Sequence, residues 1–205
     1  DNETFIVDNT PPYLNKTVGI PQYTGDLPPG DYYINTSTPI WLETLDMSGT
    51  EGIYYGFEFN GTWYPRNMSD SYCGNSNITE ILGTYWYVYH NYSVDFGPIM
   101  FHEDCVHTLT VMTQDNLGQY TLHTETFTVD SVPPVTTKII GDPSYDTDND
   151  TIPEYVTTST PLWFTATDIS GIKGTYYRIW HDDTWHPVDM NDSYCGNNNI
   201  TEIDG

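Results

Sequence analysis

Two hexapeptides, Thr36-Ser-Thr-Pro-Ile-Trp41 and Thr158-Ser-Thr-Pro-Leu-Trp163, lie 122 residues apart and reveal how this chain is organised. At the same offset, 27 of the 48 positions in residues 36–83 are identical to those in residues 158–205. Identity this high at an offset that never changes indicates a duplicated unit. Duplicated units of this size usually fold as successive copies of one module. We call the residue 122 positions later the counterpart of a given residue.

Each unit opens after a short proline-rich connector. The segment Thr4-Phe-Ile-Val-Asp8 has Thr126-Phe-Thr-Val-Asp130 as its counterpart, and Pro11-Pro12 corresponds to Pro133-Pro134. Consecutive prolines lack backbone donors and favour an extended chain, so they suit a stiff linker. We therefore predict the last strand of a preceding repeat, one complete repeat and the N-terminal part of a second repeat, at residues 1–8, 9–130 and 131–205.

Within a repeat, short apolar runs are separated by turns. Residues 108–113 and 126–129 alternate apolar side chains with threonine, and residues 53–59 are mostly aromatic and β-branched. Asn60-Gly61 is typical of a two-residue hairpin turn, and residues 115–118 separate two candidate antiparallel strands. No stretch has helical periodicity longer than about two turns. The sequence predicts an all-β chain of two-sheet sandwiches.

The order of these motifs resembles the immunoglobulin-like repeats strung along large cell-surface proteins of archaea and some bacteria. The residues that carry the resemblance are Asp130, Pro133, Pro134, Asp168, Ser170, Gly171, Tyr176, Tyr177 and Trp185, with His107, Leu109, Asp115, Asn116 and Gly118 in the complete repeat. The resemblance covers nearly the whole chain and implies tandem immunoglobulin-like β-sandwich domains with short Pro-Pro linkers. It implies no single task, because such repeats serve as surface layers, filaments, stalks, adhesin arms and spacers beside enzymes.

The net charge of the chain argues against some classes of binding partner. Asp and Glu number 29 against 5 Lys and Arg, giving a formal net charge of -24. Such a surface repels phosphate backbones and anionic headgroups, so we expect no nucleic-acid partner and no binding to bare membrane. No apolar run reaches about 18 residues, so we expect no membrane span, and we expect the chain to begin after any targeting segment.

The cysteines suggest a disulfide in the complete repeat. Cys73 and Cys105 both lie in that repeat, and Cys195 is the counterpart of Cys73, with its own partner expected beyond the chain. We predict a Cys73–Cys105 disulfide that closes a loop of roughly thirty residues and stabilises by about 3 kcal/mol. A metal site is the alternative, although no CxxC pair or HxxxH helix accompanies these cysteines.

Sequons for N-glycosylation are unusually frequent. Ten of the fifteen asparagines are followed two positions later by Ser or Thr, where chance predicts about three. They are Asn2, Asn15, Asn35, Asn60, Asn67, Asn77, Asn91, Asn149, Asn191 and Asn199. Sequons and disulfides together predict an extracellular, glycosylated protein. An accident of an Asn- and Thr-rich composition is the alternative.

Catalytic motifs are missing from the sequence. The densest polar cluster is the segment Phe101–His107. On a strand, His102 and Asp104 would face away from Glu103 and Cys105, so no set of three metal ligands converges there. No nucleophile elbow, P-loop or dinucleotide fingerprint is present. We therefore expect no enzymatic activity and no required cofactor.

Calcium is the ligand that the carboxylates favour most. Asp146, Asp148 and Asp150 alternate along one segment, which is the spacing that hard cations use, although a solvated loop is the plainer explanation. A second hypothesis combines the connector residues Asp8 and Asp130 with loop residues. The loop partners would be Asp46 or Asp168, and the cation would stiffen the array.

The tryptophans fall into two classes. Trp41 and Trp163 lie in strand patterns and are predicted to be core, whereas Trp63 and Trp185 follow hairpin turns and are predicted to be half exposed. Exposed coplanar aromatic rings would provide a platform for sugars, but cross-strand packing is the plainer interpretation.

These observations favour a structural, non-enzymatic module of an extracellular glycosylated surface assembly, such as a filament, stalk or surface layer. The alternatives are an adhesin or carbohydrate-binding arm, or a spacer module of a large secreted enzyme. We also expect self-assembly with neighbouring copies or repeats. A β-strand could be donated by the segment Thr4, Phe5, Ile6 and Val7, since an open sheet edge accepts an added strand.

Overall fold

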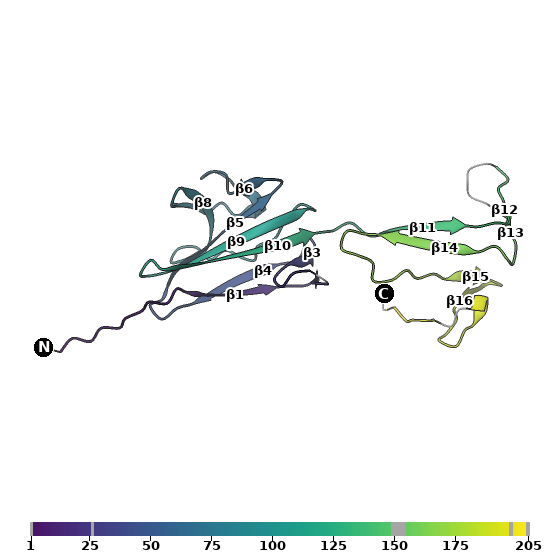
Figure 1. The fold of residues 1–205 in the computed structure, drawn as a ribbon, viewed down its shortest axis with the longest axis horizontal. Helices are drawn as coiled ribbons and strands as arrows, with labels where there is room; N and C mark the ends of the chain where they lie inside the picture. The colour runs from purple at the N-terminus through teal and green to yellow at the C-terminus, as the bar shows by residue number, and fades with distance from the viewer. Residues whose placement is uncertain (1, 26, 149–154, 197–198, 204–205) are drawn as a thin grey trace. The chain divides into compact units, whose positions relative to one another are not determined.

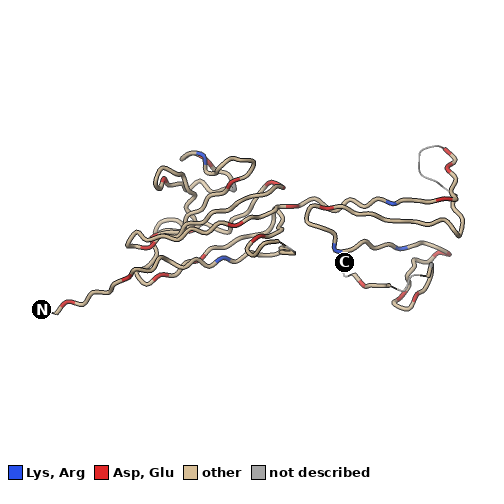
Figure 2. The backbone as a smooth tube through the Cα atoms, in the orientation of Figure 1, with Lys and Arg blue, Asp and Glu red and all other residues tan. Residues whose placement is uncertain are grey.

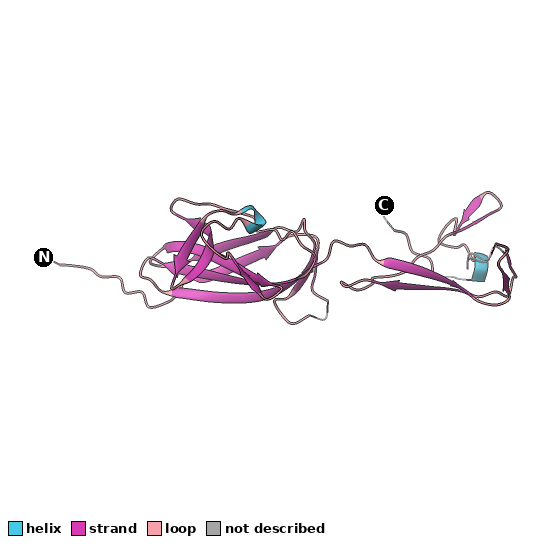
Figure 3. Cartoon of the chain, turned by 90° about the horizontal axis from the view of Figure 1, so that it is seen from above, coloured by secondary structure: helices cyan, strands magenta, loops and turns pink. Residues whose placement is uncertain are grey.

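The computed structural model describes residues 2–25, 27–148, 155–196 and 199–203. These residues form β-strands and loops, and their helical content is limited to two short 3-10 turns, η1 (Tyr72–Gly74) and η2 (Tyr194–Gly196) (Figure 3). The predicted all-β class is confirmed. The chain divides into two compact units, unit 1 (Asp1–Pro133) and unit 2 (Pro134–Gly205). Within the described residues, no helix is long and apolar enough to span a bilayer.

Unit 1 contains a large sheet and a small one (Figure 1). The strands of the large sheet follow the order β2 (Gln22–Tyr23), β3 (Tyr32–Ile34), β10 (Tyr120–Val129), β9 (Val106–Asp115), β5 (Thr50–Phe59), β8 (Thr84–Asn91) and β7 (Ile78–Ile81), and β6 (Thr62–Tyr64) pairs with β5. The small sheet pairs β1 (Tyr13–Val18) with β4 (Ile40–Leu45) in antiparallel register. All pairs in the large sheet are antiparallel except β3 with β10.

The core of unit 1 is built from alternate residues of these strands. Ile40 and Leu42 of β4 pack in one cluster with Tyr55, Phe57, Tyr87, Leu109, Phe127 and Val129 of the large sheet. Between the two buried residues of β4, Trp41 points outward and is 41% exposed, so its predicted core position is wrong. Successive side chains of a strand face opposite sides, so only one of the adjacent residues Ile40 and Trp41 can face the core. Because both are apolar, the sequence does not indicate which one it is.

The turns follow the sequence closely. Asn60 and Gly61 both have positive φ, 50° and 69°, as the two-residue turn between β5 and β6 requires. The turn after β9 is closed by the amide of Gly118, which donates to the carbonyl of Asp115 at 3.2 Å. Both predicted turns are therefore confirmed.

Unit 2 repeats the first part of this pattern. It contains the pairs β11 (Val135–Ile140) with β14 (Leu162–Thr167), β12 (Ser144–Tyr145) with β13 (Tyr155–Val156), and β15 (Ile179–His181) with β16 (Thr184–His186). Its apolar residues are far more exposed: Leu162 is 50% exposed, whereas its equivalent Ile40 is fully buried. The sequence holds no counterpart of residues 84–130, whose strands cover these positions in unit 1. Trp163 is 51% exposed, so its predicted core position is also not found.

Candidate cation site at the connector

The connector that precedes unit 1's first strand is tied to the sandwich by hydrogen bonds. Gln119 donates from its side chain to the carbonyl of Asp8 at 3.4 Å, and the hydroxyl of Thr121 donates to the carbonyl of Pro12 at 2.8 Å. The backbone amide of Ser48 donates to the carboxylate of Asp8 at 3.1 Å. These hydrogen bonds hold the connector against the loops at one end of the unit, and we call this position of the connector its seat.

Three carboxylates converge at this seat. Asp8 comes from the connector, Asp46 from the loop after β4 and Asp115 from the end of β9. One oxygen of each lies within 4.8 Å of one oxygen of each of the others. Asp115 is fully buried, whereas Asp8 and Asp46 are half buried. The site is therefore open to solvent on the side of the connector and the loop.

Local turns explain why these aspartates point inward. The carboxylate of Asp46 accepts from the amide of Ser48 at 2.8 Å and from its hydroxyl at 2.7 Å. Asp115 Oδ1 accepts from the amides of Leu117 and Gln119 at 2.9 and 2.7 Å, and Oδ2 accepts from the Gln119 side chain at 2.8 Å. Aspartate is favoured at such positions because its side chain can satisfy backbone donors two residues ahead.

Hydrogen bonds favour the ionised form of the Asp8 carboxylate. The Asp8 pKa lies below its ordinary value, chiefly because the hydroxyl of Thr10 donates to the carboxylate at 2.7 Å and the Thr10 amide donates at 3.0 Å. The Ser48 amide adds to this effect. Carboxylates held this close repel one another, and a bound cation removes that repulsion. Calcium holds oxygens at about 2.4 Å, so two of its ligands lie at most about 4.8 Å apart.

Two cation sites were predicted from the sequence, one at the connector and one at Asp146, Asp148 and Asp150, and the structure brings carboxylates together at the connector. It brings Asp8 and Asp46 together as the connector hypothesis expected, and it adds Asp115, which sequence reasoning assigned only to a turn. In the other candidate, the amide of Asp148 donates to the carboxylate of Asp146 at 3.2 Å. Asp150 lies outside the described residues, so the Asp146, Asp148 and Asp150 set stays a prediction.

The predicted disulfide also stays a prediction. Cys105 carries a free thiol here, with Sγ 3.2 Å from Nε2 of His107, while the side chains of Cys73 and Cys195 lie outside the described atoms. Tyr72, next to Cys73, has its ring 4.9 Å from that of Phe57, and the His107 ring lies 6.1 Å from the same phenylalanine. The chain segments that carry the two cysteines thus pack around one aromatic residue.

The sequons lie mainly on the surface. The exposed ones are Asn2, Asn15, Asn60, Asn67, Asn77, Asn191 and Asn199. Asn35 and Asn91 are half buried, and the oxygen of each accepts a hydrogen bond from the hydroxyl of its own sequon serine, at 2.7 Å and 3.1 Å. Asn149 lies outside the described residues.

Acidic positions are spread along both units and basic positions are few (Figure 2).

Comparison with known proteins assigns no family. The sequence matches no protein-family model and no curated protein. Among solved structures, it is similar to dimeric latent PorU from Porphyromonas gingivalis, with 19% identity and a TM-score of 0.35. The match covers 65% of this chain and 12% of the PorU chain. A likeness at this level defines neither the fold family nor the function.

Proposed function

We propose that this chain is a non-catalytic, structural module of an extracellular, N-glycosylated surface assembly. Its units would be tandem immunoglobulin-like β-sandwich repeats joined by Pro-Pro connectors, in a cell-surface protein of archaeal or bacterial type. The observation that carries this proposal is the seat of the connector, where Asp8 is hydrogen-bonded to the loop of Asp46 and Ser48 and to the turn that follows Asp115.

A seated connector suits a spacer better than an enzyme. A flexible linker lets neighbouring domains rotate freely, whereas a linker bonded to one domain sets the direction in which the chain leaves it. A calcium ion shared by Asp8, Asp46 and Asp115 would lock the connector further, because it would cross-link the connector, a loop and a strand end. The unit would then act as a rigid segment.

The surface supports the same proposal. Seven exposed sequons in the described residues would carry glycans away from the sandwich. The segment of Phe5, Ile6 and Val7 is exposed and lies outside any strand (Figure 1). In the proposed assembly this segment would pair with the sheet edge of a neighbouring copy or repeat. The carbohydrate-binding alternative gains less support, because Trp63 packs edge-on against Trp86, with ring centroids 5.3 Å apart.

Labelling of intact cells tests the location, and glycopeptide mapping tests the surface chemistry. Antibodies raised against residues 9–130 are expected to label the outside of cells that produce the protein. Mass spectrometry of the native protein is expected to find glycans on the exposed sequons Asn67 and Asn77. Labelling that appears only after the cells are permeabilised, together with bare sequons, would refute the proposal.

A further inference from the structure

The outer face of the small sheet in unit 1 carries exposed apolar side chains. Tyr13, Asn15 and Thr17 of β1 are exposed and alternate with half-buried residues, so they share the face of β1 that points away from the core. Tyr13 lies opposite Leu45 of β4, and Thr17 lies opposite Trp41. Tyr13 is 69% exposed and Leu45 is 76% exposed. Apolar side chains that gather on one exposed face mark a candidate contact surface.

A sequon lies in the middle of this face. Its asparagine and its threonine, Asn15 and Thr17, are two residues apart on one strand and therefore point to the same side. The side-chain nitrogen of Asn15 donates to the carboxylate of Glu43 at 3.4 Å, and Glu43 is the residue directly opposite on β4. The nitrogen that would carry a sugar thus lies over the sheet, and the sugar would begin its path above the outer face.

Tyr13 is placed to contact that sugar. It precedes Asn15 by two residues on the same strand, which separates the two by roughly 7 Å along the face. A pyranose ring has a face of C–H groups, and such a face packs on an aromatic ring as other apolar groups do. The first sugar on Asn15 can therefore reach the Tyr13 ring while it stays on the sheet.

Two other sequons have a tyrosine at the same spacing, but their rings are already packed. Tyr89, two positions before Asn91, is 6% exposed and belongs to the core of unit 1. Tyr33, two positions before Asn35, is half buried and stacks on Tyr23 with the ring centroids 6.3 Å apart. Neither ring offers a free face like that of the exposed Tyr13.

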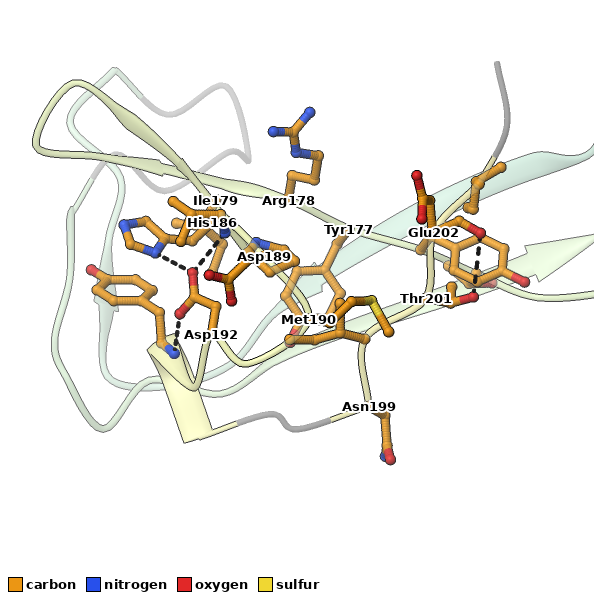
Figure 4. Close-up of a pocket in the computed structure, with 17 residues that line it drawn as sticks. Tyr177, Arg178, Ile179, His186, Asp189, Met190, Asp192, Asn199, Thr201 and Glu202 are labelled. Carbon is orange, nitrogen blue, oxygen red and sulfur yellow. Dashed lines mark hydrogen bonds and ion pairs between the residues drawn. The ribbon is translucent and has the colours of Figure 1, made fainter.

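Five further sequons have no aromatic residue at this spacing. The residues two positions before Asn60, Asn67, Asn77, Asn191 and Asn199 are Glu58, Pro65, Asn75, Asp189 and Asn197. Asn199 also lies on a loop of unit 2 rather than on a strand (Figure 4). Among these sequons, Asn15 is the one that combines a strand, an exposed asparagine and an exposed tyrosine on the same face.

We propose that Asn15 carries a glycan whose first sugar packs on the ring of Tyr13 and covers the outer face of the small sheet. The inference deepens the proposed function and rests on it for glycosylation itself. The small sheet consists of two strands, β1 and β4. Two-stranded pairs are only marginally stable by themselves, so a sugar that packs on β1 stabilises the place where unit 1 begins.

Removal of the sequon threonine tests the contribution of the glycan on the full chain produced by its own cells. Thr17→Val keeps Asn15 and the β-branched shape, and it is expected to lower the Tm of unit 1 by about 3 °C. Thr79→Val, which removes the Asn77 sequon from β7 in the same way, is the matched control and is expected to leave the Tm unchanged. In chain produced without glycosylation, Thr17→Val is expected to be neutral.

Removal of the tyrosine ring tests the contact itself. In a Tyr13→Thr background, Thr17→Val is expected to lower the Tm no further, because the glycan has lost its platform. Tyr120→Thr, which removes another exposed tyrosine from β10, is expected to leave the effect of Thr17→Val intact. In nuclear magnetic resonance spectra, the C–H protons of the first sugar on Asn15 are expected to shift upfield from the ring current, and Tyr13→Thr is expected to abolish this shift.

The possible failures differ from those of the proposed function. A native protein with glycans on Asn67 and Asn77 but a bare Asn15 would overturn the inference and leave the proposed function standing. A glycosylated Asn15 would do the same if Thr17→Val had an equal effect, or no effect, with and without the Tyr13 ring. Bare asparagines at all the sequons would refute the proposed function together with the inference.

Discussion

Replacing Asp46 with Asn separates the cation-binding role of the carboxylate from its structural role. The side-chain oxygen of Asn can still accept from the amide and hydroxyl of Ser48, which Asp46 does at 2.8 and 2.7 Å. Its amide nitrogen removes one of the three negative charges that lie within 4.8 Å of one another and can donate to the remaining carboxylates. We therefore expect Asp46→Asn to be at least as stable as the unmodified chain without calcium.

The calcium response is expected to differ strongly between the two proteins. A ligand that binds only the folded state at 100 times its Kd stabilises by about 2.7 kcal/mol. For a unit of this size, each 1 kcal/mol raises the Tm by roughly 3 °C, so the unmodified unit 1 is expected to gain about 8 °C. Asp46→Asn has lost one charged ligand, and its gain is expected to fall to about 2 °C or less at the same calcium concentration.

Differential scanning calorimetry with a chelator and with saturating calcium measures both quantities. Glu80→Gln, which removes an exposed charge from β7, is the control and is expected to keep the full calcium response. An equal calcium shift in Asp46→Asn and the unmodified chain would refute the reasoning, as would the absence of any shift in the unmodified chain.

Burial lowers the pKa of His107 below its ordinary value of 6.5, so around this pH the folded protein holds fewer protons than the unfolded chain. The free energy of unfolding is therefore expected to fall as the pH drops through 6.5, by at most about 1.4 kcal/mol per pH unit. Urea titrations at several pH values measure this slope, and the His107→Phe variant is expected to flatten it. Peptide mapping without reductant is expected to recover Cys73 linked to Cys105. Cys105→Ala is expected to lower the unfolding free energy by about 3 kcal/mol. Recovery of Cys73 and Cys105 as free thiols from the native protein would count against the disulfide. Tyr87→Phe in the chain removes the 2.9 Å bond to Asp70 and is expected to destabilise unit 1 by about 1–3 kcal/mol in the same titrations, whereas Tyr85→Phe is expected to be neutral. Nuclear magnetic relaxation is expected to show a rigid backbone from Asp8 to Thr10. Fast motion of the backbone from Asp8 up to Leu14 would show that the connector is not seated.

Much of the strand pattern could be read from the sequence, because alternation and turn residues are local signals. The strands over residues 53–59, 108–113 and 126–129 and the turn at Asn60-Gly61 were predicted correctly for this reason. Trp41 was misplaced because Ile40 and Trp41 are adjacent and both apolar, and only the pairing of β4 with β1 fixes which one faces inward.

The candidate sites depend on contacts that no local pattern encodes. Asp115 was missed as a possible ligand because it is far from Asp8 in the sequence. The two carboxylates come together only when β9 takes its place in the large sheet, which brings the end of β9 next to the connector. Its position as the first residue of the Asp-Asn-Leu-Gly turn was the only local signal.

Electron cryomicroscopy of the native assembly, isolated from the surface of the cells that make it, tests the structural role most directly. The proposal predicts a filament or layer in which β-sandwich units recur along the chain, with density for glycans and with each connector seated against the Asp46 loop. Isolated particles with freely rotating units and no repeating contacts would contradict it.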